Sequence, residues 1–126
     1  MKDIETREDV VLLVDTFYQS VKENKKLGYI FKDVAKIDWE EHLPKMYSFW
    51  ASILLGEQSF TGNPMIKHIA LSKLTPMTEV EFEEWLLLFN TTIDQLFEGK
   101  VANEAKLRAG NIARLMMHKI ESLKES

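Results

Sequence analysis

Cysteine is absent from the 126-residue sequence, and glycine and proline are scarce, with five and three copies. Without cysteine the chain can form no disulfide bridge, thiolate nucleophile or zinc-finger framework. Hydrophobic residues make up 45% of the chain and charged residues 29%, a composition typical of globular proteins and not of disordered ones. We therefore expect one globular domain over residues 1–126, large enough to bury a core.

The chain also lacks a basic cluster and a long apolar run. It carries 16 basic and 20 acidic residues, for a net charge of −4. A mildly acidic protein is a poor partner for nucleic acid or an anionic membrane. No apolar run approaches the ~20 residues that span a bilayer, and the first residues have no apolar segment typical of a secretory signal. We expect a cytoplasmic protein that binds neither nucleic acid nor membranes.

The signature motifs of familiar enzymes are missing from the sequence. There is no G-x-G-x-x-G, P-loop, H-E-x-x-H or G-x-S-x-G pattern. The acidic pairs Glu40-Glu41 and Glu83-Glu84 fall on the polar faces of helical patterns, where a solvated surface is the simpler interpretation. No enzyme class is indicated by motif, so whether the chain is an enzyme stays open.

Helical periodicity dominates the first half of the chain. Thr6 can cap a first helix with Asp9 as capping-box partner, and the pattern ends near Asn24. The apolar stripe of this helix is Val10, Val11, Val14, Phe17, Tyr18 and Val21. A second helix is expected to open at Asp38 and to close at Gly56. Pro44 conflicts with it, so this helix is either kinked there or preceded by a separate first turn.

Two further helices are predicted in the second half. The first runs from Glu79 to Phe97, with Thr78 and Glu81 as a capping box, and the second covers roughly 103–123. Gly110 within the last helix suggests close helix packing there. Because no segment shows strand alternation, we expect an all-α fold.

His68 stands out among the three histidines. It follows the Gly62-Asn63-Pro64 loop on a short apolar segment, whereas His118 lies in a basic stretch and is read as a surface residue. A lone histidine on an apolar face is more often a hydrogen-bonded core or surface residue than a ligand. No pair of histidines has the i, i+4 spacing of a helical zinc site.

Polar side-chain tips also occur on apolar faces. Tyr18 and Trp85 lie on the inward stripes of two long helices, and His42 lies near the start of another. Tyrosine and tryptophan bury well but need a hydrogen-bond partner for the O–H or N–H group. The pattern leaves open whether these polar groups meet at one site in the fold, and whether the His42 side chain points inward.

Several short segments match a known family in order and spacing. They are Phe17-Tyr18, Leu27-Gly28 followed by Ile30-Phe31, Trp39 with His42, Phe49-Trp50, Leu55-Gly56, Gly62-Asn63-Pro64 with His68, and Trp85-Leu86 with Leu88-Phe89. Over nearly its whole length the chain resembles a truncated haemoglobin of group III. The resemblance implies a truncated globin-like helical sandwich around a haem pocket.

The resemblance also implies residue roles. His68 matches the proximal ligand of the haem iron, and Phe31 matches the aromatic that packs on the porphyrin. Tyr18, His42 and Trp85 match polar residues on the distal side, where a bound gas lies. Met46 is implied as an apolar wall beside the vacant iron position, and Lys45 is implied to reach a haem propionate. Without cysteine for thioether links, the cofactor is expected to be a non-covalent haem b.

Three functions remain open at this point. The first is a haem protein that binds oxygen, or another diatomic ligand such as NO or CO, for oxygen transport or haem redox chemistry, with a reductase as a protein partner. The second is a haem enzyme, peroxidase-like or a nitric oxide dioxygenase, for which His42 could act as a distal acid–base group. The third is a haem-free helical interaction module.

Overall fold

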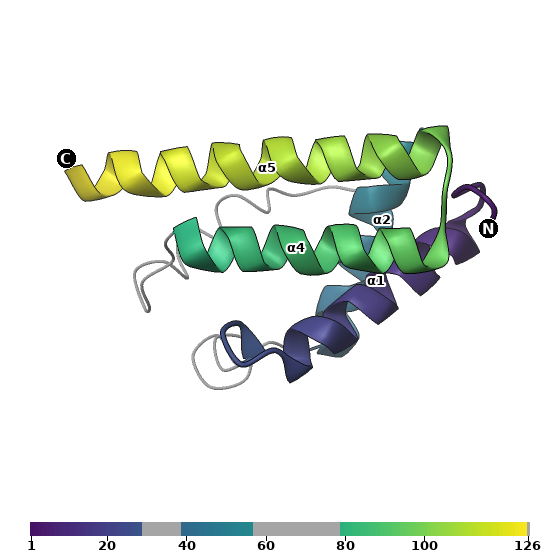
Figure 1. Cartoon of the computed structure of the whole chain (residues 1–126), viewed down its shortest axis with the longest axis horizontal. Coiled ribbons are helices and arrows are strands. Elements are labelled where there is room, and N and C mark those ends of the chain that lie inside the picture. Colours follow the sequence, from purple (N-terminus) through teal and green to yellow (C-terminus); the bar gives the residue numbers. More distant parts are fainter. Residues whose placement is uncertain (29–38, 57–78, 126) are drawn as a thin grey trace.

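The computed structural model describes residues 1–28, 39–56 and 79–125, with side chains of the last helix described as far as His118. Four helices and no strands occur in these ranges: α1 (Arg7–Glu23), α2 (Trp39–Leu55), α4 (Glu79–Leu96) and α5 (Lys100–Glu125). Helices α4 and α5 lie side by side and antiparallel, α1 crosses α4 obliquely, and α2 passes behind α1 toward the start of α5 (Figure 1). The expected all-α helical fold is confirmed.

Helix α1 begins with the predicted capping box. The Thr6 hydroxyl accepts the backbone N–H of Asp9 at 3.3 Å, and the Asp9 carboxylate accepts the backbone N–H of Thr6 at 3.1 Å. The helix ends before Asn24, as predicted. Its buried stripe contains Leu13, which is not among the predicted stripe residues, and Val11 is only half-buried. The stripe therefore follows the i, i+3, i+4 spacing more regularly than predicted.

Helix α2 is one continuous helix that includes Pro44. The alternative of a separate first turn is therefore wrong. Proline has no N–H, so the helix loses the bond normally donated to the carbonyl one turn earlier, but Pro44 is only the sixth residue of the helix and is exposed. Gly56 follows the last residue with a φ of +73°, which confirms the predicted stop. Asp38, predicted to open the helix, lies outside the described residues.

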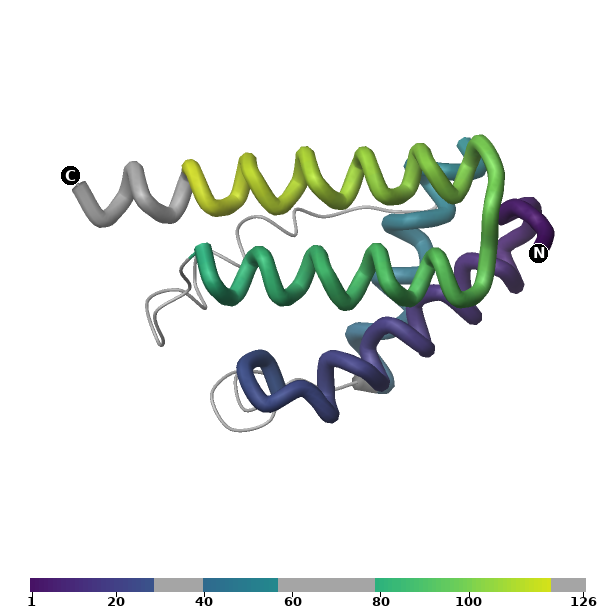
Figure 2. The backbone as a smooth tube through the Cα atoms, viewed as in Figure 1, coloured from purple at the N-terminus to yellow at the C-terminus, as the bar shows by residue number. Residues whose placement is uncertain are grey.

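Helix α4 has nearly its predicted bounds, whereas α5 begins three residues earlier than expected, at Lys100. The cause is Asp3, whose carboxylate accepts the N–H groups of Val101 at 2.9 Å and Ala102 at 2.8 Å. The N-terminal segment therefore caps a helix almost one hundred residues away, and Figure 2 shows the N-terminus beside the corner between α4 and α5. Thr78, the predicted cap of α4, lies outside the described residues.

Alanines bring α5 close to the other helices. Ala102, Ala105, Ala109 and Ala113 are all buried along one face of α5. A Cβ built at Gly110 would meet no described atom nearer than Arg114 Nη1, at 3.6 Å, an ordinary contact. The close packing predicted at Gly110 thus occurs at the alanines among the described residues.

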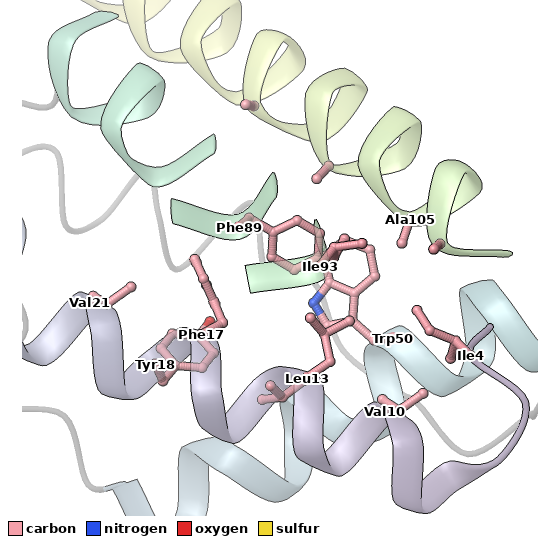
Figure 3. Close-up of a cluster of buried hydrophobic side chains, with 14 of the residues drawn as sticks. Ile4, Val10, Leu13, Phe17, Tyr18, Val21, Trp50, Phe89, Ile93 and Ala105 are labelled. Carbon is pink, nitrogen blue, oxygen red and sulfur yellow. The ribbon is translucent and has the colours of Figure 1, made fainter. Parts of the chain in front are cut away.

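An aromatic cluster occupies the centre of the core. The Phe89 ring of α4 stacks on Trp50 of α2, with centroids 4.7 Å apart, and meets Phe17 of α1 edge-on at 5.1 Å. Figure 3 shows these rings between the helices, with aliphatic side chains of α1 below them. Large rings from α1 and α2 thus meet on Phe89 of α4, and the preferred geometry of ring contacts favours one arrangement of the three helices. None of the described helices is both long enough and apolar enough to cross a membrane.

Candidate functional site

Tyr18 and His42 face one another across the contact between α1 and α2. Their ring centroids lie 5.2 Å apart with an interplanar angle of 85°, an edge-to-face contact. Tyr18 is 8% exposed, and the Nε2 atom of His42 is buried. The structure therefore answers the question that the sequence left open, because the imidazole of His42 points inward.

The phenol of Tyr18 lies in an apolar environment. Burial raises its pKa well above the usual value of 10, because the phenolate would lose its hydration. At neutral pH the phenol consequently keeps its proton. A neutral phenol is a hydrogen-bond donor, whereas a phenolate can only accept.

Trp85 joins this pair through Phe17. The Phe17 ring lies 5.0 Å from Tyr18 and 5.6 Å from Trp85, both edge-on. Trp85 also stacks on Phe89, at 5.6 Å and with an interplanar angle of 6°. Three predicted site residues from α1, α2 and α4 are thus linked by ring contacts, from His42 to Tyr18 and from Tyr18 through the buried Phe17 to Trp85. Their ring positions are fixed by packing in the core and not by loops.

The two other described site residues differ in their surroundings. Met46 is half-buried and packs against the hydrophobic core, which suits an apolar wall. Lys45 is exposed and pairs with Glu41 one turn earlier, with 2.9 Å between Nζ and Oε1. An exposed ion pair of this kind contributes little to stability. Phe31 and His68 lie outside the described residues, and their predicted roles remain predictions.

Sequence reasoning missed one polar contact beside this site. The hydroxyl of Tyr47 on α2 donates a hydrogen bond to the Asp15 carboxylate on α1. Nothing in the spacing of residues 15 and 47 indicates that they meet. His118 is exposed, as predicted. Within the described ranges, no group of three or more His, Asp or Glu side chains could hold a metal ion.

The polar groups of the candidate site are suited to hydrogen bonding with a small ligand. A neutral phenol, an inward imidazole and an indole N–H are the polar groups, and the surrounding side chains are aromatic or aliphatic. Such groups can donate hydrogen bonds to a small ligand that carries partial negative charge, and they do so more strongly where water is excluded. The donor set therefore fits a small polar ligand held beside a large apolar group.

Comparison with known proteins identifies the family. The family model for bacterial-like globins matches residues 2–120. The chain is 34% identical over 110 residues to a group 3 truncated haemoglobin of Campylobacter jejuni, covering 85% of this chain and 84% of that protein. The crystal structure of a group III truncated haemoglobin from Campylobacter jejuni superposes with a TM-score of 0.81 at 33% identity, over 95% of both chains. The chain belongs to the bacterial-like globins and, among them, to the group III truncated haemoglobins.

Proposed function

We propose that the chain holds one haem b non-covalently, with His68 as the iron ligand, and binds a diatomic gas on the opposite face. Membership of the globin family supports a haem cofactor and a gas ligand. The observation that carries the proposal is the inward His42 imidazole beside the buried Tyr18 phenol. We take O2 as the main ligand, with NO and CO as other ligands of the same site.

The haem iron would supply the coordination position for the gas. The protein supplies the surroundings: Tyr18 and Trp85 donate hydrogen bonds to the bound gas, and Met46 limits the space beside it. Phe31 packs against the porphyrin, and Lys45 reaches a propionate after leaving Glu41. Because oxygen requires ferrous iron, we include a reductase among the partners.

The test of the iron ligand is His68→Gly, studied with and without imidazole in the buffer. We expect the purified protein to bind added haem and to give a five-coordinate ferrous spectrum. The variant should lose this spectrum and regain it when imidazole fills the space left by the side chain. An unchanged ferrous spectrum of His68→Gly without imidazole would show that another group binds the iron. A wild-type protein that takes up no haem would favour the helical interaction module instead.

His42 is proposed to act as a gate and secondary donor, and not as a permanent second iron ligand. Its ring packs edge-on against Tyr18, on the turn of α2 that precedes Pro44. Spectra of the unliganded ferric and ferrous forms distinguish the two roles. A low-spin spectrum of two histidine ligands at neutral pH, abolished by His42→Leu, would contradict the gate.

The inward orientation of His42 also favours a second candidate function, a peroxidase-like haem enzyme. A distal imidazole can move a proton between the two oxygens of a hydroperoxide as their bond breaks. Turnover of hydroperoxide with a phenolic donor tests this function. His42→Leu should then lower the rate by about a hundredfold or more, the usual contribution of a general acid–base group. Equal rates in both proteins would rule out this role for His42.

A further inference from the structure

A continuous set of aromatic rings leads away from the candidate site through the core. Trp85 stacks on Phe89 at 5.6 Å, and Phe89 stacks on Trp50 at 4.7 Å with an interplanar angle of 23°. Figure 3 shows the Phe89 and Trp50 rings next to one another in the cluster of buried side chains. Two indoles, side chains that can be oxidised by one electron, are therefore connected through one phenyl ring. We call these three residues the aromatic stack.

Tyr47 continues this set toward the surface. It lies three residues before Trp50 on α2, a spacing that places two side chains on the same side of a helix. It is half-buried and packs against the core to which Trp50 belongs. Its hydroxyl donates a hydrogen bond to the exposed Asp15 carboxylate. A bond from Arg7 Nη2 to Ser48 Oγ, at 3.1 Å, is a further link between the same two helices.

The Tyr47 phenol is suited to coupled loss of an electron and a proton. Burial, together with the hydrogen bond to Asp15, raises its pKa to about 12, so the phenol is protonated at neutral pH. Removing an electron from a protonated phenol makes it a strong acid, and a carboxylate already in hydrogen-bond contact can take the proton without rearrangement. The geometry therefore provides both a route for the electron and an acceptor for the proton.

We propose that the Tyr47–Asp15 pair is the site at which small phenolic donors deliver electrons to the haem pocket through the aromatic stack. This inference rests on the proposed haem function. The oxidant is a hydroperoxide reduced in the pocket, and the donor is a phenol that contacts Tyr47 from solvent.

The electrons and protons balance as follows. Oxidation of the stack leaves an indole radical cation at Trp50, which takes one electron from Tyr47 while the phenolic proton passes to Asp15. A donor phenol then gives a hydrogen atom equivalent to the tyrosyl radical, and Asp15 releases its proton. Two such cycles supply the two electrons and two protons that break the O–O bond, giving one alcohol, one water and two phenoxyl radicals.

The first test uses the haem-loaded protein. Ferric protein is mixed with hydroperoxide, frozen, and examined by electron paramagnetic resonance, and the radical is located by spin trapping and peptide mass spectrometry. We expect a tyrosyl radical on Tyr47, lost in Tyr47→Phe and in Trp50→Phe. Tyr29→Phe is the matched control, because it removes a tyrosine that the route does not use, and it should keep the signal. The haem absorbance of every variant is recorded to show that haem binding is retained.

A trapped radical on another residue, with normal haem absorbance, would overturn the proposal and leave the haem function intact.

A second measurement does not depend on haem. Pulse radiolysis with the azidyl radical oxidises tryptophan in the chain, and conversion of indole to tyrosyl radical is followed by absorbance. We expect conversion in the wild type, its loss in Tyr47→Phe, and a rate about a hundredfold lower in Asp15→Asn, the lower end of what a positioned base contributes.

The two measurements separate the two proposals. Conversion in a protein that takes up no haem would contradict only the proposed haem function. Absence of conversion, or equal conversion in Tyr47→Phe, would overturn the electron route whatever the haem spectrum.

Discussion

Tyr18 and Trp85 are the residues expected to set the lifetime of bound oxygen. Oxygen gains partial negative charge when bound to ferrous haem, and a hydrogen bond to a charged acceptor contributes roughly 1.5–3 kcal/mol. Because about 1.4 kcal/mol is a factor of ten, Tyr18→Phe and Trp85→Phe should each speed oxygen dissociation by about ten- to a hundredfold. Carbon monoxide gains little charge, so its dissociation should change much less. Stopped-flow dissociation rates measure both gases.

Met46→Leu is the matched control for these two variants, because it alters a half-buried apolar side chain without removing a donor. This variant should change the dissociation rates of oxygen and carbon monoxide by similar factors. Equal effects of Tyr18→Phe on oxygen and carbon monoxide would indicate altered access or packing. No effect of either donor variant on oxygen would rule out both hydrogen bonds.

Tyr47 gives a prediction at alkaline pH. Because burial and the bond to Asp15 raise its pKa to about 12, Tyr47 stays protonated in the folded state while an unfolded tyrosine ionises near 10. The stability that this difference provides is present below pH 10 and is lost as the pH rises from 10 toward 12. Asp15→Asn should lower the pKa of Tyr47. The phenolate absorbance of each protein, minus that of its Tyr47→Phe counterpart, measures the shift, and an unchanged midpoint would contradict the role of Asp15.

At the scale of helices, the cap of α5 is the feature that connects the two ends of the described chain. Asp3 accepts two N–H groups of the first turn of α5, and the backbone N–H of Glu98 bonds the carbonyl of Lys2 at 3.0 Å. Gly99 permits this approach: its φ is +136°, and a Cβ there would lie 2.6 Å from Asp3 Cγ. The N-terminal segment thus holds the corner between α4 and α5.

Asp3→Ala should therefore destabilise the fold by about 0.5–2 kcal/mol, the usual contribution of a helix cap. Asp3→Ser is the control, because its hydroxyl can still accept a hydrogen bond from one of the N–H groups. This variant should lose less of the free energy of unfolding than Asp3→Ala. Urea unfolding followed by circular dichroism measures both. Equal loss in the two variants would mean that the cap itself contributes little.

Asp3 also predicts a dependence on acid. Desolvation acts to raise the pKa of its carboxyl, but the N–H groups of Val101, Ala102 and Ile4 outweigh it, and the pKa is lowered from 3.8. The stabilisation is thus present above about pH 4 and is lost as the pH falls through the lower folded-state value. The pKa of Asp9 is also lowered, so Asp9 contributes an acid dependence of the same sign. The part due to Asp3 is the difference between the pH dependence of stability in the wild type and in Asp3→Ala.

For the whole molecule, Phe89 is the side chain on which the helix arrangement depends most. It is fully buried and contacts rings from α1 and α2 as well as Trp85 of its own helix. Phe89→Ala should cost about 3–5 kcal/mol, because it removes a large buried ring and leaves a cavity. Leu87→Ala on the same helix, at a site 60% exposed, should change stability by less than about 0.5 kcal/mol. Similar losses in both variants would show that the core is not organised around Phe89.

Much of the fold could be predicted from local patterns. The capping box at Thr6, the stop at Gly56 and the bounds of α4 were all predicted, because capping and helical periodicity involve residues a few positions apart. The start of α5 could not be predicted in this way. Its cap comes from Asp3, and no short-range rule connects residues 3 and 101.

For the candidate site, too, some features follow from local patterns and others depend on contacts between distant residues. The sequence by itself determined that Tyr18 and Trp85 lie on apolar helix faces, because periodicity decides which side of a helix is buried. Only the tertiary structure decided that His42 points inward against Tyr18, and that Tyr47 meets Asp15. Those contacts depend on the angle at which α1 and α2 cross. That angle is set by the fit of Phe17, Trp50 and Phe89 in the core, which is a property of packing in three dimensions and not of spacing along the chain.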